Sequence, residues 1–156
     1  MKLHCLGTTG FHPSPTRHTA CYYLPEASLI LDAGTGVFRM VEHLLREPKE
    51  SLTILLSHAH LDHVVGLTFM IDALAVTDLK HIRVVGATEK IDAVKQHLYN
   101  ELLFPVAPSF EFETLDGLAG RMPLNGFQLD WFAMEHPGGS LGFCLQNDSA
   151  KLAYVT

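Results

Sequence analysis

The sequence predicts a mixed α/β domain built in layers. Its 156 residues are a normal length for one compact domain. Apolar residues make up 47% and charged residues 18%, which allows a core and excludes disordered and low-complexity classes. Apolar patterns predict strands, then strand–helix alternation, then strands again, the order of a layered α/β fold. No repeat, linker or charge run divides the chain, so residues 1–156 are expected to form a single domain.

The first third of the chain predicts four strands. Residues 2–6 form a short strand that ends at a glycine-flanked turn. The segments 19–24 and 28–31 are separated by Pro25-Glu26-Ala27, which predicts an antiparallel hairpin. The run at 52–56 is apolar throughout, and such continuous apolar content predicts a buried strand.

Three helices are expected between strands. Apolar residues at helical spacing predict a helix over 37–45, stopped before Pro48. The mostly apolar run 64–74 predicts a helix facing a core. A further helix is expected over 88–98, with Thr88 as its N-cap. The remaining strands are expected at 82–85, 110–115, 127–134, 141–146 and 151–156, the last three of them antiparallel.

Charge and cysteine content narrow the class of protein. Eleven basic against seventeen acidic side chains give a net charge of −6, which argues against binding to nucleic acid or anionic lipid by bulk charge. No stretch approaches the roughly 20 apolar residues of a membrane helix, and the N-terminus does not resemble a secretory signal. Cys5, Cys21 and Cys144 are odd in number and widely spaced, so a reducing, cytoplasmic location is expected.

Histidines concentrate in one short segment. The chain has ten histidines, and three of them share the segment Ser57-His58-Ala59-His60-Leu61-Asp62-His63 with one carboxylate. In an extended segment His58 and His60 point the same way and can offer both imidazoles to one cation. Asp62 and His63 fall where the chain turns into the next helix, within reach of a second point. Imidazole and carboxylate are zinc ligands and also suit iron and manganese.

The alternative interpretation is a polar surface loop in which Asp62 caps a helix. Three neighbouring imidazoles repel one another on protonation, and a bound cation removes that cost, which favours the metal site. His136 also follows an apolar strand, at the start of a Pro-Gly-Gly loop. A lone histidine at a strand end is more often structural. Here the cation held by His58 and His60 still lacks a third nitrogen ligand, and we interpret His136 as that ligand.

The pattern HxHxDH after a hydrophobic strand resembles the metallo-β-lactamase-fold hydrolases. The glycine-rich turn at 6–10, the strand exit at 31–36, the Pro-Ser-Pro loop and His136-Pro137 are most similar to the ribonuclease Z-like branch. The resemblance covers essentially the whole chain and implies an αββα sandwich. It also implies two divalent metal ions, zinc in the first place, with manganese or iron as alternatives.

The resemblance implies roles for individual residues. His58, His60 and His136 would hold the first metal, and Asp62 and His63 the second. Asp32 would orient a ligand histidine, although fixing the Gly34 turn is an equal alternative. His18 and Ser140 are candidates for contact with substrate, and a structural role is the alternative for each.

The activity implied is hydrolysis by a metal-activated water, with Asp62 as both ligand and proton acceptor. The favoured substrate is a phosphodiester, either a nucleotide or RNA; scattered basic residues argue against a large nucleic acid. Thioester or lactone hydrolysis uses the same metals, and an iron-dependent oxygenase or electron-transfer module is a further class. The partners expected are therefore a small-molecule or nucleotide substrate and, as an open option, a second copy of the chain.

Length adds one more expectation. Members of this superfamily are two similar α/β halves, and the second half supplies an aspartate that bridges both metals and a final histidine. The present chain supplies five of these seven ligands, and its last strand ends where the bridging aspartate is expected next. The sequence therefore predicts a domain that is incomplete at its C-terminus, and a non-catalytic fragment is the alternative function.

Overall fold

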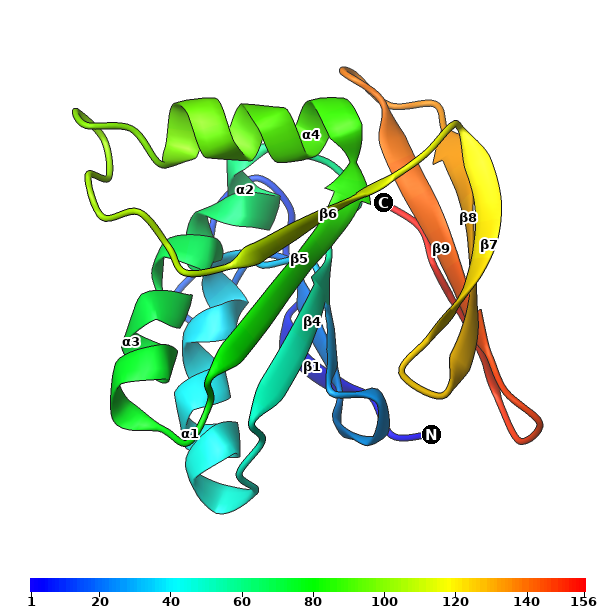
Figure 1. Cartoon of the computed structure of the whole chain (residues 1–156), viewed down its shortest axis with the longest axis horizontal. Helices are drawn as coiled ribbons and strands as arrows, with labels where there is room; N and C mark the ends of the chain where they lie inside the picture. The colour runs from blue at the N-terminus through cyan, green and yellow to red at the C-terminus, as the bar shows by residue number, and fades with distance from the viewer.

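Two β-sheets pack face to face in the computed structural model, which describes residues 1–156 (Figure 1). Helices cover the outer face of the larger sheet, so the layers run helix, sheet, sheet. This arrangement confirms the mixed α/β layered fold. No helix of the chain is both long and apolar enough to cross a membrane.

The larger sheet has six strands in the order β1-β2-β3-β4-β5-β6. The first two pairings are antiparallel and the next three are parallel, because helices connect the later strands and return the chain to the same end of the sheet. The predicted hairpin is confirmed as β2 and β3. The strands are β1 (His4–Gly7), β2 (Cys21–Leu24), β3 (Leu29–Leu31), β4 (Ser51–Leu55), β5 (His81–Ala87) and β6 (Glu111–Leu115).

The smaller sheet is antiparallel throughout, in the order β10-β9-β8-β7. Three of its strands match the predicted segments, and the bounds of β8 agree with the expected 127–134. The fourth, β7, was not expected from the sequence. The strands are β7 (Ala119–Leu124), β8 (Phe127–Met134), β9 (Ser140–Gln146) and β10 (Lys151–Tyr154).

The helical layer is more broken than the sequence predicts. The helix expected over 64–74 consists of three short pieces that begin earlier, and the expected N-cap at Thr88 is wrong, because Ala87 holds that position without a side-chain hydrogen bond. The pieces are η1 (Pro25–Ala27), η2 (Thr35–Arg39), α1 (Met40–Arg46), α2 (Leu61–Val64), η3 (Val65–Thr68), α3 (Met70–Val76), α4 (Thr88–Ala93) and η4 (Val94–Leu98).

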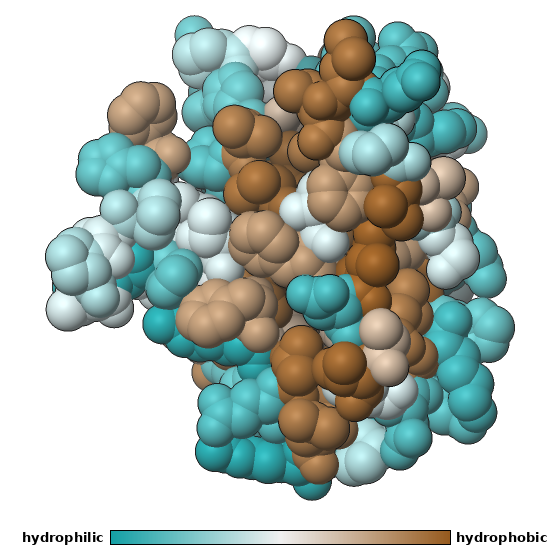
Figure 2. Space-filling model, turned by 90° about the vertical axis from the view of Figure 1, so that its left-hand side faces the viewer, coloured by the Kyte–Doolittle hydropathy of each residue, from teal (hydrophilic) through white to brown (hydrophobic).

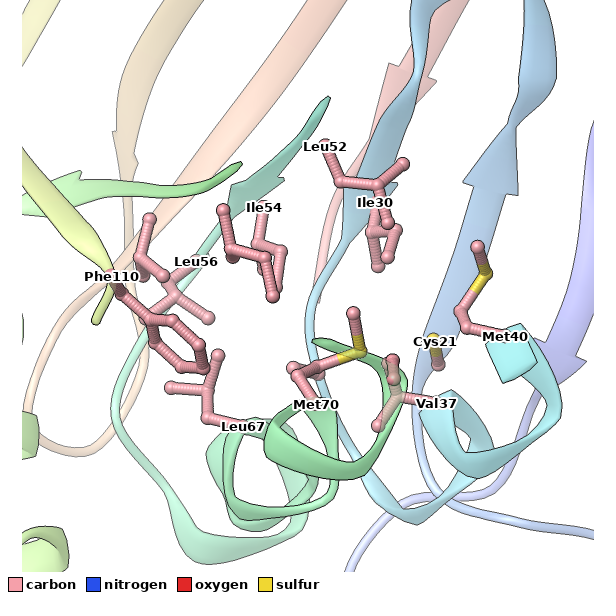
Figure 3. Close-up of a cluster of buried hydrophobic side chains, with 14 of the residues drawn as sticks. Cys21, Ile30, Val37, Met40, Leu52, Ile54, Leu56, Leu67, Met70 and Phe110 are labelled. Atoms are coloured by element: carbon pink, nitrogen blue, oxygen red, sulfur yellow. The ribbon is translucent and has the colours of Figure 1, made fainter. Parts of the chain in front are cut away.

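Two apolar cores hold the layers together. One lies between the helices and the larger sheet, where Leu67 and Met70 point toward Ile54 of β4 (Figure 3). The other lies between the two sheets and contains Leu129 and Phe143, both fully buried. Burial of these apolar side chains is the main driving force for folding.

Apolar side chains also reach the surface on the helical side of the molecule (Figure 2). A groove of about 230 Å³ lies there beside the histidine segment. It is lined by Ala59, Leu61, Val64, Ala93, Val94, His97, Leu98 and Leu103.

Candidate metal centre

The histidine cluster forms where three strands end. β4 and β3 are parallel neighbours, so the segment after β4 and Asp32 after β3 emerge at the same edge of the larger sheet. β8 of the smaller sheet ends at Met134, and the loop after it brings His136 to the same place. The fold thus gathers residues that are far apart in the sequence.

His58, His60 and His136 form one set of donors. One ring nitrogen from each of the three lies within 4.8 Å of the other two. The shortest separation is 3.2 Å, between His136 Nε2 and His60 Nδ1. A tetrahedral zinc ion with bonds of about 2.0–2.1 Å separates its nitrogen ligands by about 3.3 Å. The three residues therefore fit a zinc ion without rearrangement of this pair.

His58 is held in the form that binds a metal. Its side chain is buried, and the Ser57 hydroxyl lies 2.9 Å from its Nδ1, which leaves Nε2 for the cluster. Burial, followed by the charge of the neighbouring His63, lowers the pKa of His58 to about 4. The imidazole is therefore neutral near pH 7.

Asp62 and His63 form a second pair of donors. Asp62 Oδ2 lies 3.4 Å from His63 Nε2, a spacing that suits two ligands of one cation. The backbone N–H of Phe11 donates to the same Asp62 oxygen at 2.7 Å. Burial opposes a charge on His63, but the hydrogen bond and charge of Asp32 outweigh it and raise its pKa.

Asp32 lies beneath both donor sets. It is fully buried and adopts a left-handed backbone with φ of 54°. Its Oδ2 accepts from His63 Nδ1 at 2.6 Å, from the Ser57 hydroxyl at 2.6 Å and from Tyr154 at 2.7 Å. Its Oδ1 accepts the Ser57 N–H at 2.7 Å. None of these bonds goes to the Gly34 turn, so the contacts favour the orienting role over the turn-fixing one.

Ser57 and Tyr154 were not expected at the site. Ser57 connects Asp32 with His58 through its hydroxyl, and its place directly before the histidine segment was the only sequence signal for it. Tyr154 comes from β10 of the other sheet, and nothing in the sequence pattern pointed to it. Both are buried and hydrogen-bonded, so they support the positions of the donors.

The two candidate substrate contacts have structural partners instead. Ser140 is buried, and its hydroxyl lies 3.5 Å from the Ser57 carbonyl and 3.4 Å from Thr156 Oγ1. These contacts give Ser140 a structural role, and its contact with substrate stays a prediction. His18 Nδ1 lies 3.1 Å from Thr35 Oγ1, and the ring packs on Phe38. No contact joins His18 to the histidine cluster.

A cavity of about 410 Å³ adjoins His63. Its wall includes the turn Thr8-Thr9-Gly10 on one side and Tyr154 with its neighbours in β10 on the other. His63 therefore lies beside open space rather than wholly inside the packed core. A small molecule can approach this part of the site.

A family model described as cAMP phosphodiesterases class-II matches residues 42–132, which include the whole histidine segment. The chain belongs to this family. Curated relatives include ribonuclease Z of Pyrococcus abyssi, which is 31% identical over 151 residues. The match covers 94% of this chain and 48% of the relative. Ribonuclease Z of Exiguobacterium sibiricum is 23% identical over 158 residues, covering 97% and 50%. The present chain spans about half the length of these curated relatives.

Solved structures place the class-II phosphodiesterase-family chain in the metallo-β-lactamase fold. The metallo-β-lactamase-fold protein YhfI of Bacillus subtilis matches with a TM-score of 0.73 and 18% identity, over 97% of this chain and 60% of that one. Human tRNase Z, short form, matches with a TM-score of 0.68 and 22% identity, over 100% and 69%. Yeast PDE1 matches with a TM-score of 0.69 and 14% identity, over 97% and 62%. The resemblance drawn from the HxHxDH segment is confirmed.

Proposed function

We propose that the chain forms the metal centre of a metal-dependent phosphodiesterase that acts on a nucleotide or RNA-like diester. The observation that carries the proposal is that the loop after β8 brings His136 to the HxHxDH segment, so that two donor sets meet and one of them, through His63, adjoins an open cavity. His58, His60 and His136 would hold one divalent ion, and Asp62 and His63 the other. Zinc is the first candidate, with manganese or iron as alternatives.

The residues of the chain have separate tasks in such a reaction. Two adjacent divalent ions would lower the pKa of water and polarise the phosphoryl group under attack. Asp32 fixes the His63 ring through Nδ1, so that Nε2 faces Asp62. His58 stays neutral and so remains a donor near pH 7. The Asp62 carboxylate can also accept a proton from the attacking water.

Family membership and the relatives support the substrate class. The matching family is described as phosphodiesterases, and the similar curated proteins are ribonucleases. The net charge of −6 favours a small diester over a long nucleic acid, because phosphate contacts along a strand need clustered lysine and arginine. We therefore propose a nucleotide-sized substrate in the cavity beside His63.

The cellular compartment in which the protein acts is part of the proposal. All three cysteines are free, which suits a reducing compartment such as the cytoplasm. The single-domain organisation and a homodimer stay predictions.

Metal titration and a substrate comparison test the proposal together. Calorimetry with Zn²⁺ should give two bound ions per chain, and His136→Ala should lose affinity while the exposed control His97→Ala does not. The zinc-loaded chain should then hydrolyse bis(p-nitrophenyl) phosphate faster than a thioester such as S-lactoylglutathione. Turnover of the thioester alone would overturn the substrate assignment. Failure to bind zinc would overturn the metal centre, and zinc binding without either activity would favour the non-catalytic alternative over a hydrolase.

A further inference from the structure

The loop that carries His136 has few anchors of its own. Residues 135–139 join β8 to β9, and a backbone hydrogen bond of 2.7 Å from Gly139 N–H to the His136 carbonyl closes a tight turn. Gly138 and Gly139 both adopt left-handed backbones, with φ of 78° and 76°. Because glycine has a large choice of conformations, such a turn needs external contacts to hold one shape.

Lys90 supplies such a contact. Its Nζ donates to the Gly138 carbonyl, and Lys90 is the only side chain outside the histidine cluster that hydrogen-bonds residues 135–139. Lys90 belongs to α4 of the helical layer, whereas the loop belongs to the smaller sheet. Figure 1 shows the loop after β8 reaching over the start of α4. The hydrogen bond therefore ties two separate layers together at the metal centre.

The environment of Lys90 shows that its position is fixed by the fold. The side chain is only 14% exposed, which is unusual because lysine is rarely buried without a partner. Glu89 Oε1 lies 3.4 Å from Nζ but is itself largely exposed, so it screens the charge only in part. The Gly138 carbonyl supplies the protein-side acceptor that a desolvated ammonium needs.

The turn transmits the position of Lys90 to the donors. A methyl group built on Gly139 would lie 3.7 Å from Lys90 Nζ, and one built on Gly138 would lie 3.9 Å from His60 Nε2. The ammonium and the His60 ring therefore both lie close to the same two-glycine turn. On that turn His136 Nε2 stands 3.2 Å from His60 Nδ1.

We propose that Lys90 is a positioning residue for the metal centre, holding the Gly138 carbonyl and thereby the turn that aims His136 at His60. The proposal rests on the proposed function, since it takes His136 as a metal ligand. Outer contacts of this kind typically change metal affinity by about 10–100-fold. An arginine at this position keeps a donor for the carbonyl, whereas a methionine keeps the stem and loses the donor.

Cobalt and zinc binding to the purified chain test the proposal. Lys90→Met is expected to weaken metal affinity by about 10–100-fold and to reduce the visible absorption of bound Co²⁺. Lys90→Arg should restore binding to within a few-fold of the original. Lys95→Met, an exposed lysine in η4, is the matched control and should bind as the unmodified chain does. Thermal unfolding of the metal-free variants should show the same transition for all four chains.

A double-mutant cycle separates this proposal from the one it rests on. If Lys90 acts through His136, Lys90→Met costs no further affinity in a His136→Ala background. If His136→Ala alone binds normally, the proposed ligand set is wrong. If His136→Ala weakens binding but Lys90→Met does not, only the role of Lys90 is wrong. Equal losses from Lys90→Met and Lys90→Arg would also overturn it, as would an unchanged affinity with a raised KM for a diester substrate.

Discussion

Asp32 Oδ2 lies 2.6 Å from His63 Nδ1, and both side chains are shielded from solvent, at 0% and 9% exposure. This contact decides which nitrogen of His63 is free, because the ring can offer only Nε2 once Nδ1 is bonded. Nε2 then faces the Asp62 carboxylate. The left-handed backbone of Asp32 is part of the same arrangement, since it follows directly from the end of β3.

Asp32→Asn should damage both the metal centre and the fold. Asparagine has the same shape and tolerates the left-handed backbone, but it lacks the charge that holds His63. We expect metal affinity to fall by about 10–100-fold and the free energy of unfolding by about 3 kcal/mol. Calorimetry and urea unfolding measure the two effects. Asp130→Asn, which breaks an exposed pair with Arg121, is the control, and equal behaviour of the two variants would contradict the assignment.

Tyr154→Phe should destabilise the protein because it leaves a buried acceptor without one of its donors. The Tyr154 hydroxyl donates to Asp32 Oδ2 at 2.7 Å, and burial together with the Asp32 charge raises the pKa of this phenol. A hydrogen bond to a charged group contributes about 1.5–3 kcal/mol. Tyr22→Phe removes a neighbouring hydroxyl that makes no hydrogen bond and should cost less than about 0.5 kcal/mol. Matching losses of unfolding free energy in urea would refute this prediction.

Gly66→Ala should force apart the two segments of the metal centre. A methyl group on Gly66 would lie 2.3 Å from the Gly34 carbonyl oxygen and 2.7 Å from that of Ala33, closer than real contacts allow. The turn that follows Asp32 would therefore move. We expect a loss of about 1–3 kcal/mol in stability and weaker metal binding. Gly10→Ala meets nothing within 4 Å and should be neutral; similar urea midpoints for both variants would argue against the close approach.

Local spacing accounts for the parts of the structure that the sequence predicts well. The HxHxDH segment, the hairpin of β2 and β3 and the bounds of β8 all depend on residues near one another in the chain. The same period-based reasoning joined 64–74 into one helix. It failed there because Gly66 packs against the Gly34 turn, a contact that no local pattern contains.

Long-range contacts explain what the sequence could not predict. β7 contains Gly120 and Pro123, which have low strand propensity, yet it forms an edge strand where proline is tolerated. The Trp131 ring of β8 packs over Gly120, so the neighbouring strand supplies what local propensity lacks. Tyr154 likewise reaches Asp32 only because the two sheets pack together, and Lys90 reaches the loop after β8 only because the helical layer lies beside it. His136 could be proposed in advance because it follows an apolar strand and the first metal lacked a third nitrogen, and the resemblance then implied the same role.

His43 should make folding depend on pH in a region remote from the metal centre. Its ring packs edge-on against His4, at 4.7 Å between centroids, and against Tyr23. Burial, and then the charges of His4 and Arg46, lower the pKa of His43 below its ordinary value of 6.5. A group whose pKa falls on folding stabilises the folded state when neutral, so this contribution is present above pH 6.5 and is lost as the pH falls below it.

The pH dependence is measured as a difference between two chains. Without added metal, the free energy of unfolding of the unmodified chain minus that of His43→Gln should shrink between pH 7.5 and pH 5, because glutamine does not titrate. His97→Gln, at an exposed position in η4, controls for the loss of a histidine as such. A difference that stays constant or grows toward acid pH would show that the charged His43 ring is tolerated beside His4 and Arg46. The pKa of His43 in the folded protein would then not lie below its pKa in the unfolded chain.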